Sequence, residues 1–223
     1  MSRKPRNRGA DSANRHNNRR DGLFASYSER REAIRQRLAD FRAVPPAGYF
    51  YELAYCLMTP QSKAAHAYAV VGLLRACRFM ESPFDAQNLL RTKAHYIRFH
   101  RTKARHLLAA HAQMQEISNT LSSKNDALSL REWLVSNVNG LGMKEATHFL
   151  RNIGRNDGLA ILDRHILRNL VRYGAIRRIP TSLTRKKYLQ VERKFVEFSH
   201  KVGIPLDELD LLFWSMETGE IRK

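Results

Sequence analysis

Apolar residues recur at intervals of three and four along nearly the whole chain from Leu23 onward. This spacing places them on one face of an α-helix, whereas β-strands would show alternating apolar and polar positions. Sustained alternation is absent from the sequence. The pattern therefore predicts an all-α fold.

Individual helices can be placed from their apolar runs and their breakers. The first is expected to begin at Ser26, which forms a capping box with Glu29, and to stop before Pro45 and Pro46. Two buried helices are expected in "GYFYELAYCLMT" and "KAAHAYAVVGLLRACRFM", separated by "TPQS". A further helix is expected in "HRTKARHLLAAHAQMQEI", with its basic residues on the face opposite the apolar one.

A glycine-containing turn joins two amphipathic segments around residue 140. "SLREWLVSNV" predicts the first helix, with Ser129 and Glu132 as its capping box, and "GMKEATHFLRNIG" predicts the second. Gly140 and Gly142 let the backbone turn sharply and leave amide N–H groups open at a helix N-terminus, where a phosphate can bind. This helix-hairpin-helix pattern indicates sequence-independent DNA binding, although such turns also serve merely to link helices.

A basic stripe follows on the next expected helix, in "GLAILDRHILRNLVRYG". Asp163 stands at the N-cap position of this helix. Arg164, Arg168 and Arg172 are spaced four residues apart and therefore share one face. That face is either solvated or directed at phosphates.

The charge of the chain favours a nucleic-acid partner. The 39 Lys and Arg residues outnumber the 21 Asp and Glu residues, which gives a formal net charge of +18. A membrane is not expected, since no apolar run reaches the roughly 18 residues of a span. The two cysteines are expected to be reduced core thiols, and the histidines lack the spacing of a metal site, so no metal or cofactor is expected.

Residues 1–22 have almost no apolar character and are rich in Arg, Asn and Ser. Such a composition predicts a disordered tail. The tail is either a solvated extension or a basic arm that follows DNA phosphates.

The hairpin "GLGMKEA" followed by "LAILDRHILR" resembles the helix-hairpin-helix DNA glycosylase superfamily. With the ending "LDLLFWSMETGEIRK", these motifs are similar to the archaeal-type 8-oxoguanine DNA glycosylase/AP lyases over residues 48–223. The resemblance implies two helical domains with a catalytic cleft between them. Residues 48–154 would form the domain that ends in the helix-hairpin-helix, and residues 23–47 plus 155–223 the other. Lys144 would be the nucleophile and Asp163 its partner.

The implied reaction explains a lysine at the start of a helix. A neutral amine attacks the sugar, expels the base and forms a Schiff base, which permits β-elimination of the 3′ phosphate. A helix N-terminus favours the neutral form of an amine beside it. We therefore expect a bifunctional enzyme, a DNA glycosylase and AP lyase, acting on 8-oxoguanine. The alternatives are a glycosylase for oxidised pyrimidines and a non-catalytic DNA-binding module, although binding alone requires neither Lys144 nor Asp163.

Excision also requires residues that hold the extruded base and fill its place. By resemblance, Trp214 stacks on the base. Phe99 is either a second aromatic of this site or a core residue. Lys223 either contributes to recognition through its terminal carboxylate or backbone, or lies in a frayed terminus. Gln61 in the turn "TPQS" is similar to the corresponding turn of endonuclease III and is expected to act as the wedge. The iron–sulfur cluster of endonuclease III needs four cysteines, and this chain has two.

The remaining DNA contacts are assigned to the hairpin glycines and to the first two arginines of the basic stripe. The expected partner is double-stranded DNA containing 8-oxoguanine, bound by a monomer in the cytoplasm at the nucleoid.

Overall fold

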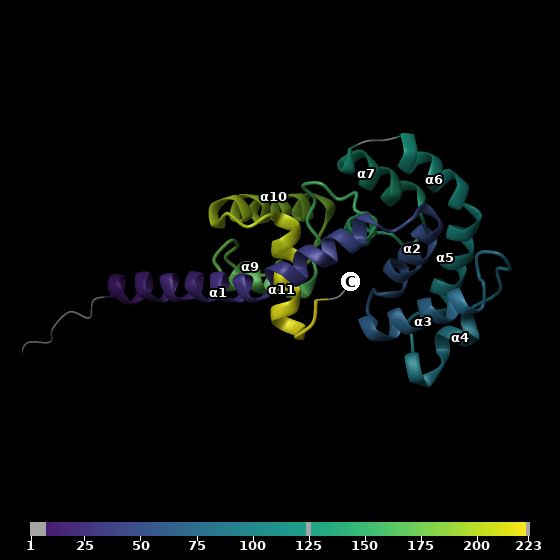
Figure 1. Cartoon of the computed structure of the whole chain (residues 1–223), viewed down its shortest axis with the longest axis horizontal. Helices are drawn as coiled ribbons and strands as arrows, with labels where there is room; N and C mark the ends of the chain where they lie inside the picture. The colour runs from purple at the N-terminus through teal and green to yellow at the C-terminus, as the bar shows by residue number, and fades with distance from the viewer. Residues whose placement is uncertain (1–7, 124–125, 222–223) are drawn as a thin grey trace, which may run out of the picture. The chain divides into compact units, whose positions relative to one another are not determined.

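The structure, a computed structural model, describes residues 8–123 and 126–221, and the side chains from Arg20 onward. Every regular element in these ranges is helical, which confirms the all-α prediction (Figure 1). The α-helices are α1 Arg8–Arg42, α2 Tyr49–Met58, α3 Ala64–Ala76, α4 Gln87–Arg91, α5 His100–Ala112, α6 Met114–Ser123, α7 Ala127–Asn137, α8 Met143–Asn152, α9 Arg164–Arg172, α10 Arg185–Val202 and α11 Leu206–Thr218. Two 3-10 helices are η1 Pro46–Gly48 and η2 Lys93–His95. Within the described ranges, no helix combines the length and the apolar character needed to cross a membrane.

The chain divides into two compact units. One contains the residues up to Leu38 together with those from Leu162, and the other contains Ala39–Ile161. Both units therefore contain parts of the predicted site: the hairpin and Lys144 lie in the second unit, and Asp163 and Trp214 lie in the first.

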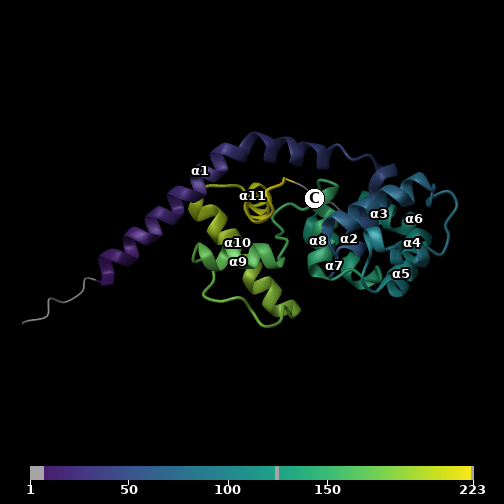
Figure 2. The ribbon, with the colours of Figure 1, turned by 90° about the horizontal axis from the view of Figure 1, so that it is seen from below.

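Helix α2 is the centre of the unit formed by Ala39–Ile161. It packs against α3, α5 and α8, and α8 in turn packs against α7 (Figure 2). Its sequence is apolar on all sides, and nine of its ten residues are buried. Helix α3, which we also expected to be buried, buries only one face, through Ala67, Val70 and Leu74.

Aromatic stacking and the buried carboxylate of Glu208 both contribute to the packing of the other unit. Tyr173 lies 5.5 Å and Phe195 lies 5.7 Å from Phe213, measured between ring centroids. Glu208 of α11 accepts hydrogen bonds from the Tyr27 hydroxyl at 2.5 Å and from Arg35 Nε at 3.2 Å, both on α1. These bonds attach α1 to α11.

The first helix begins earlier than the sequence suggests. Residues 8–22, expected to be disordered, are part of α1, and residues 1–7 lie outside the described residues. Leu23, Ile34 and Leu38 are buried, so the helix is nucleated by packing further along the chain. Once nucleated, a helix extends at little cost, and no proline interrupts it before Pro45. A low apolar content therefore did not exclude a helical conformation for this segment.

Both predicted capping boxes are wrong. Ser26 lies inside α1, where there is no free helix end to cap. Helix α7 begins before Ser129, because Asp126 has an extended backbone and its carboxylate accepts a 2.7 Å hydrogen bond from the Ser129 amide. The segment "HRTKARHLLAAHAQMQEI", expected to be one helix, belongs to two helices, α5 and α6, which meet at Gln113.

Candidate active site

The predicted helix-hairpin-helix is formed by α7 and α8. The turn is closed by a hydrogen bond from the Leu141 amide to the Val138 carbonyl at 3.2 Å, and the Leu141 side chain is buried. Gly140 has a φ of +93°, which favours glycine, whereas Gly142 has an extended backbone. A Cβ at Gly140 would lie 2.3 Å from Nδ1 of His106 on α5. Gly140 is therefore required both by its backbone conformation and by its close approach to α5.

Lys144 is the second residue of α8, as predicted. Gly142 is the N-cap, and because glycine has no side chain, none caps the helix. The amide groups of the first turn are thus available to an anion, as the sequence predicts for a phosphate. The Lys144 side chain is 25% exposed, and its Nζ lies 3.2 Å from Oε1 of Glu145. The amine is accessible from solvent and is held by one carboxylate.

Two buried residues experience the charge of Lys144. Burial raises the pKa of the Cys56 thiol on α2, and the positive charge of Lys144 partly opposes this shift. Burial, and after it the repulsion from Lys144, lower the pKa of Lys103 on α5 to about 8. Lys144 is therefore close enough to two buried groups, the Cys56 thiol and the Lys103 amine, to influence their pKa values.

Asp163 is the N-cap of α9, as predicted. Its Oδ1 accepts hydrogen bonds from the amides of His165 at 2.7 Å and Ile166 at 2.9 Å. No residue that the structure describes binds its Oδ2, and the side chain is partly exposed. One oxygen therefore caps the helix while the other is available for chemistry.

The end of α9 that carries Asp163 is tied to α11. His165 Nδ1 lies 3.8 Å from Oε2 of Glu217, and Asn169 Nδ2 donates to Oε1 of Glu217 at 3.2 Å. Trp214 is one turn before Glu217 on α11 and is partly exposed. Trp214 and Asp163 therefore belong to two helices, α11 and α9, that pack against each other in the same unit. Sequence reasoning missed His165, Asn169 and Glu217, because this contact joins residues about 50 positions apart.

The three arginines of the basic stripe are exposed along α9, with the spacing predicted. Arg164 Nε lies 3.5 Å from Nε2 of His165, and the Arg172 guanidinium lies 5.9 Å from the centroid of the Tyr173 ring. Their role as DNA contacts stays a prediction.

The sequence from residue 34 to residue 204 matches the family model of the 8-oxoguanine DNA glycosylases. This match covers more than half of the chain and includes the hairpin, Lys144 and Asp163. The chain belongs to this family.

Individual 8-oxoguanine DNA glycosylase/AP lyases are similar over almost their full length. The chain is 36% identical to the one of Fusobacterium nucleatum, covering 88% of this chain and 94% of the relative, and 39% identical to the one of Korarchaeum cryptofilum, covering 91% and 96%. The crystal structure of the Thermotoga maritima 8-oxoguanine DNA glycosylase matches with a TM-score of 0.81 at 29% identity, over 93% of this chain and 100% of that one. A Methanocaldococcus jannaschii 8-oxoguanine glycosylase/lyase, solved with a 15mer DNA containing 8-oxoguanine, matches with a TM-score of 0.79 at 31% identity, over 90% and 99%.

Two predicted DNA-contacting residues of this glycosylase family member share an uncommon backbone conformation. Gln61 has a φ of +54° and Phe99 a φ of +59°, although neither is glycine. Both side chains are exposed, Phe99 to 51%, and the Arg98 guanidinium lies 4.9 Å from the centroid of the Phe99 ring. Left-handed non-glycine residues are strained and are concentrated at functional sites.

The site residues of this family member are therefore placed in two groups. Lys144, both hairpin glycines, Gln61 and Phe99 belong to the unit Ala39–Ile161, and Asp163, Trp214 and the basic stripe belong to the other. Lys223 lies outside the described residues. The cleft between the domains stays a prediction.

Proposed function

We propose that this chain removes 8-oxoguanine from double-stranded DNA and then cleaves the strand, with Lys144 as the nucleophile. The observation that carries this proposal is the place of Lys144. It stands in the first turn of a helix with no side-chain cap, directly after a glycine hairpin, in a chain of the 8-oxoguanine DNA glycosylase family. The relatives named above carry both activities in their names.

In this proposal the hairpin binds a phosphate and Lys144 attacks the sugar. The amine Nζ forms a bond to the anomeric carbon while the bond from that carbon to the base breaks, and the base takes up a proton. The bond from the anomeric carbon to the ring oxygen then breaks, the ring oxygen takes up a proton that the amine has released, and the opened sugar is left as an imine with Nζ. The imine makes the neighbouring sugar C–H acidic. Loss of that proton expels the 3′ phosphate and cleaves the strand.

The proposed role of Asp163 follows from its two oxygens. Oδ1 is held by two backbone amides and fixes the carboxylate in place, which leaves Oδ2 to accept a proton or to stabilise the positive charge that develops on the sugar. A fixed charge of this kind lowers the energy of the transition state because it does not have to reorient.

Base recognition is proposed for Trp214, Phe99 and Lys223, with Gln61 as the wedge. Trp214 is supported by its position one turn before Glu217, the residue that contacts the first turn of α9. 8-Oxoguanine carries a proton on N7 where guanine has a lone pair, so a hydrogen-bond acceptor such as the terminal carboxylate would distinguish them. We further infer that the chain acts as a monomer, in the cytoplasm at the nucleoid.

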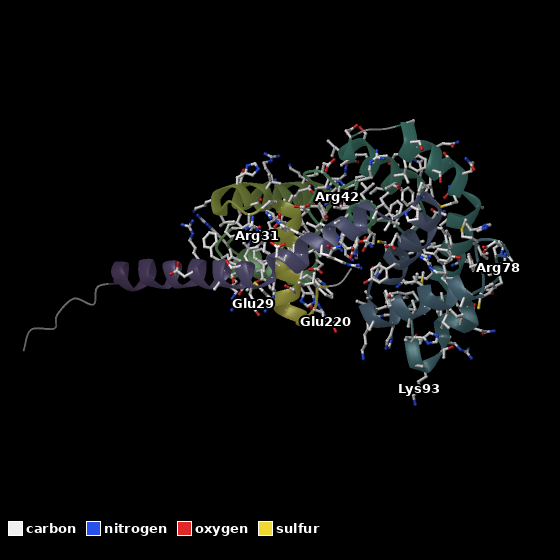
Figure 3. The ribbon with its side chains drawn as sticks, in the orientation of Figure 1. Glu29, Arg31, Arg42, Arg78, Lys93 and Glu220 are labelled. Carbon is white, nitrogen blue, oxygen red and sulfur yellow. The ribbon has the colours of Figure 1, made fainter. Side chains whose placement is uncertain are left out.

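The deciding experiment is reduction with borohydride in the presence of a duplex that contains one 8-oxoguanine. We expect a covalent protein–DNA adduct from the native chain and none from Lys144→Gln. Lys93→Gln is the matched control, because Lys93 is an exposed lysine of η2 that lies at the surface (Figure 3). It should form the adduct at the native rate.

The same assay separates the alternative functions. An adduct formed with thymine glycol but not with 8-oxoguanine would indicate a glycosylase for oxidised pyrimidines. Tight DNA binding with no adduct on either duplex would indicate a non-catalytic module. Strand cleavage by Lys144→Gln at the native rate would show that another group is the nucleophile.

A further inference from the structure

Lys103 carries a charge inside the protein that no described carboxylate neutralises. The side chain is only 5% exposed, and no carboxylate of the described residues forms an ion pair with it. Its Nζ donates hydrogen bonds to the carbonyl oxygens of Met58 and Pro60, each at 2.7 Å, and to Oγ of Ser62 at 3.3 Å. The three donors of one ammonium group thus meet three acceptors of one short segment.

The segment that Lys103 holds is the turn containing Gln61. The Ser62 amide donates to the Thr59 carbonyl at 3.0 Å, which closes a four-residue turn with Pro60 second and Gln61 third. A positive φ at the third position is characteristic of a type II turn, where glycine is preferred. Gln61 adopts this φ at +54° without being glycine. The turn therefore needs support from outside itself to hold this conformation.

The same lysine is connected to the turn containing Phe99. The Lys103 backbone amide donates to the Phe99 carbonyl at 3.0 Å, in the first turn of α5. Ser62 Oγ, which receives a bond from Lys103, also accepts a hydrogen bond from the Arg98 amide at 3.0 Å. Lys103 and Ser62 therefore join two turns that are almost 40 residues apart in the sequence.

We propose that Lys103 is a positioning residue that sets the spacing between Gln61 and Phe99, so that both side chains are presented together to the DNA from which the damaged base is extruded. The proposal rests on the proposed function. It does not place Lys103 in contact with the reacting atoms: its ammonium is occupied by the turn, and it acts through Gln61 and Phe99.

A buried ammonium group is a costly way to hold a turn if stability is the only requirement. Burial lowers the pKa of Lys103 to about 8, which shows that the interior disfavours its charge. Yet a neutral apolar side chain would leave the buried Met58 carbonyl and the partly buried Pro60 carbonyl without this donor. The lysine satisfies both carbonyl groups and reaches Ser62 as well, which links the turns rather than merely filling space.

The experiment compares Lys103→Met with two other variants. Ser62→Ala removes the oxygen that connects the turns while leaving the lysine in place. Lys63→Met is the matched control: Lys63 is an exposed lysine at the N-cap of α3, next to Ser62, and makes no side-chain cap. Lys63→Met removes one positive charge from the same region and leaves the hydrogen bond between Lys103 and Ser62 in place.

Two reactions are measured under single-turnover conditions. The first is excision of 8-oxoguanine from a duplex, with 2-aminopurine beside the lesion to report base extrusion by its fluorescence. The second is borohydride trapping on a single strand with a preformed abasic site, which requires Lys144 but no extrusion from a stacked duplex.

We expect Lys103→Met to slow extrusion and duplex excision at least tenfold while trapping at the abasic site stays within twofold of the native rate. Ser62→Ala should slow duplex excision about threefold with trapping unchanged, and Lys63→Met should match the native chain in both. If Lys103→Met does not fold, as judged by circular dichroism, Ser62→Ala carries the test alone.

The proposal is overturned if duplex excision and abasic-site trapping fall by the same factor, or if Ser62→Ala leaves extrusion unchanged. Failure of the proposed function is seen separately, because the native chain would then form no trapped adduct on either DNA.

Discussion

Replacement of Gly140 by alanine tests whether the hairpin depends on the backbone conformation or on the space around it. Gly140 has a φ of +93°, and an alanine held there costs about 1–3 kcal/mol. The less flexible unfolded chain of the alanine variant offsets about 0.4–1 kcal/mol of this. The new Cβ would also lie 2.3 Å from Nδ1 of His106, so the partly buried ring must move, at a cost of about 1 kcal/mol. We expect a net loss of about 1–4 kcal/mol in the free energy of unfolding.

Urea unfolding measures this loss, and His106→Ala divides it into its two parts. In the His106→Ala background the steric part disappears, so Gly140→Ala should cost only about 1–2 kcal/mol, the part due to φ. Gly142→Ala is the control. Gly142 has an extended backbone, and its Cβ would lie 3.0 Å from the flexible carboxylate of Glu145, so we expect only the loss of about 1 kcal/mol that alanine causes at an N-cap, and the same loss with or without His106. If Gly140→Ala cost nothing once His106 was removed, the backbone argument would be refuted.

Three further predictions concern the site and its surroundings. Asp163→Asn should stay folded, because an amide oxygen can replace Oδ1 as the cap, but excise at least about a hundredfold more slowly in single-turnover assays; unfolding of this variant would favour a purely structural role. Between pH 8 and 10.5 the unfolded chain holds a proton on Lys103 that the folded chain has released, and Lys144 and Glu145 are the charged groups that act on this lysine. Lys103 should therefore make the free energy of unfolding rise with pH in urea titrations, and Lys103→Met should reduce that rise. Removal of residues 1–22 deletes seven basic residues, so affinity for undamaged DNA should fall and its dependence on salt should become shallower; an unchanged slope would indicate a solvated extension.

Features that depend on neighbouring residues could be predicted from the sequence. The all-α class follows from apolar spacing, and the hairpin from its glycines. The cap at Asp163 was also predictable, because an Asp before an amphipathic run bonds amides only two and three residues away. The motifs that contain Lys144 and Asp163 predict them as catalytic residues, and these roles stay predictions.

Features that depend on distant residues could not be predicted. Lys103 was placed with the basic residues on the polar face of its helix, and this was wrong, because its acceptors Met58 and Pro60 lie more than 40 positions earlier. The start of α1 and the true cap of α7 were missed for related reasons. Each is decided by competition between possible helix ends, and composition alone does not rank them.

The protonation of Cys56 bears on how this protein withstands the conditions that create its substrate. 8-Oxoguanine is a product of oxidation, so the protein is needed when oxidants are abundant. Peroxides attack the thiolate form of cysteine, and burial keeps Cys56, on the helix that packs against α8, as the protonated thiol. Cys77 is exposed. An oxidant therefore reaches Cys77 first. The Cys56 thiol is protected from conversion to a sulfenic acid, and the packing of α2 against α8, the helix that carries Lys144, is preserved.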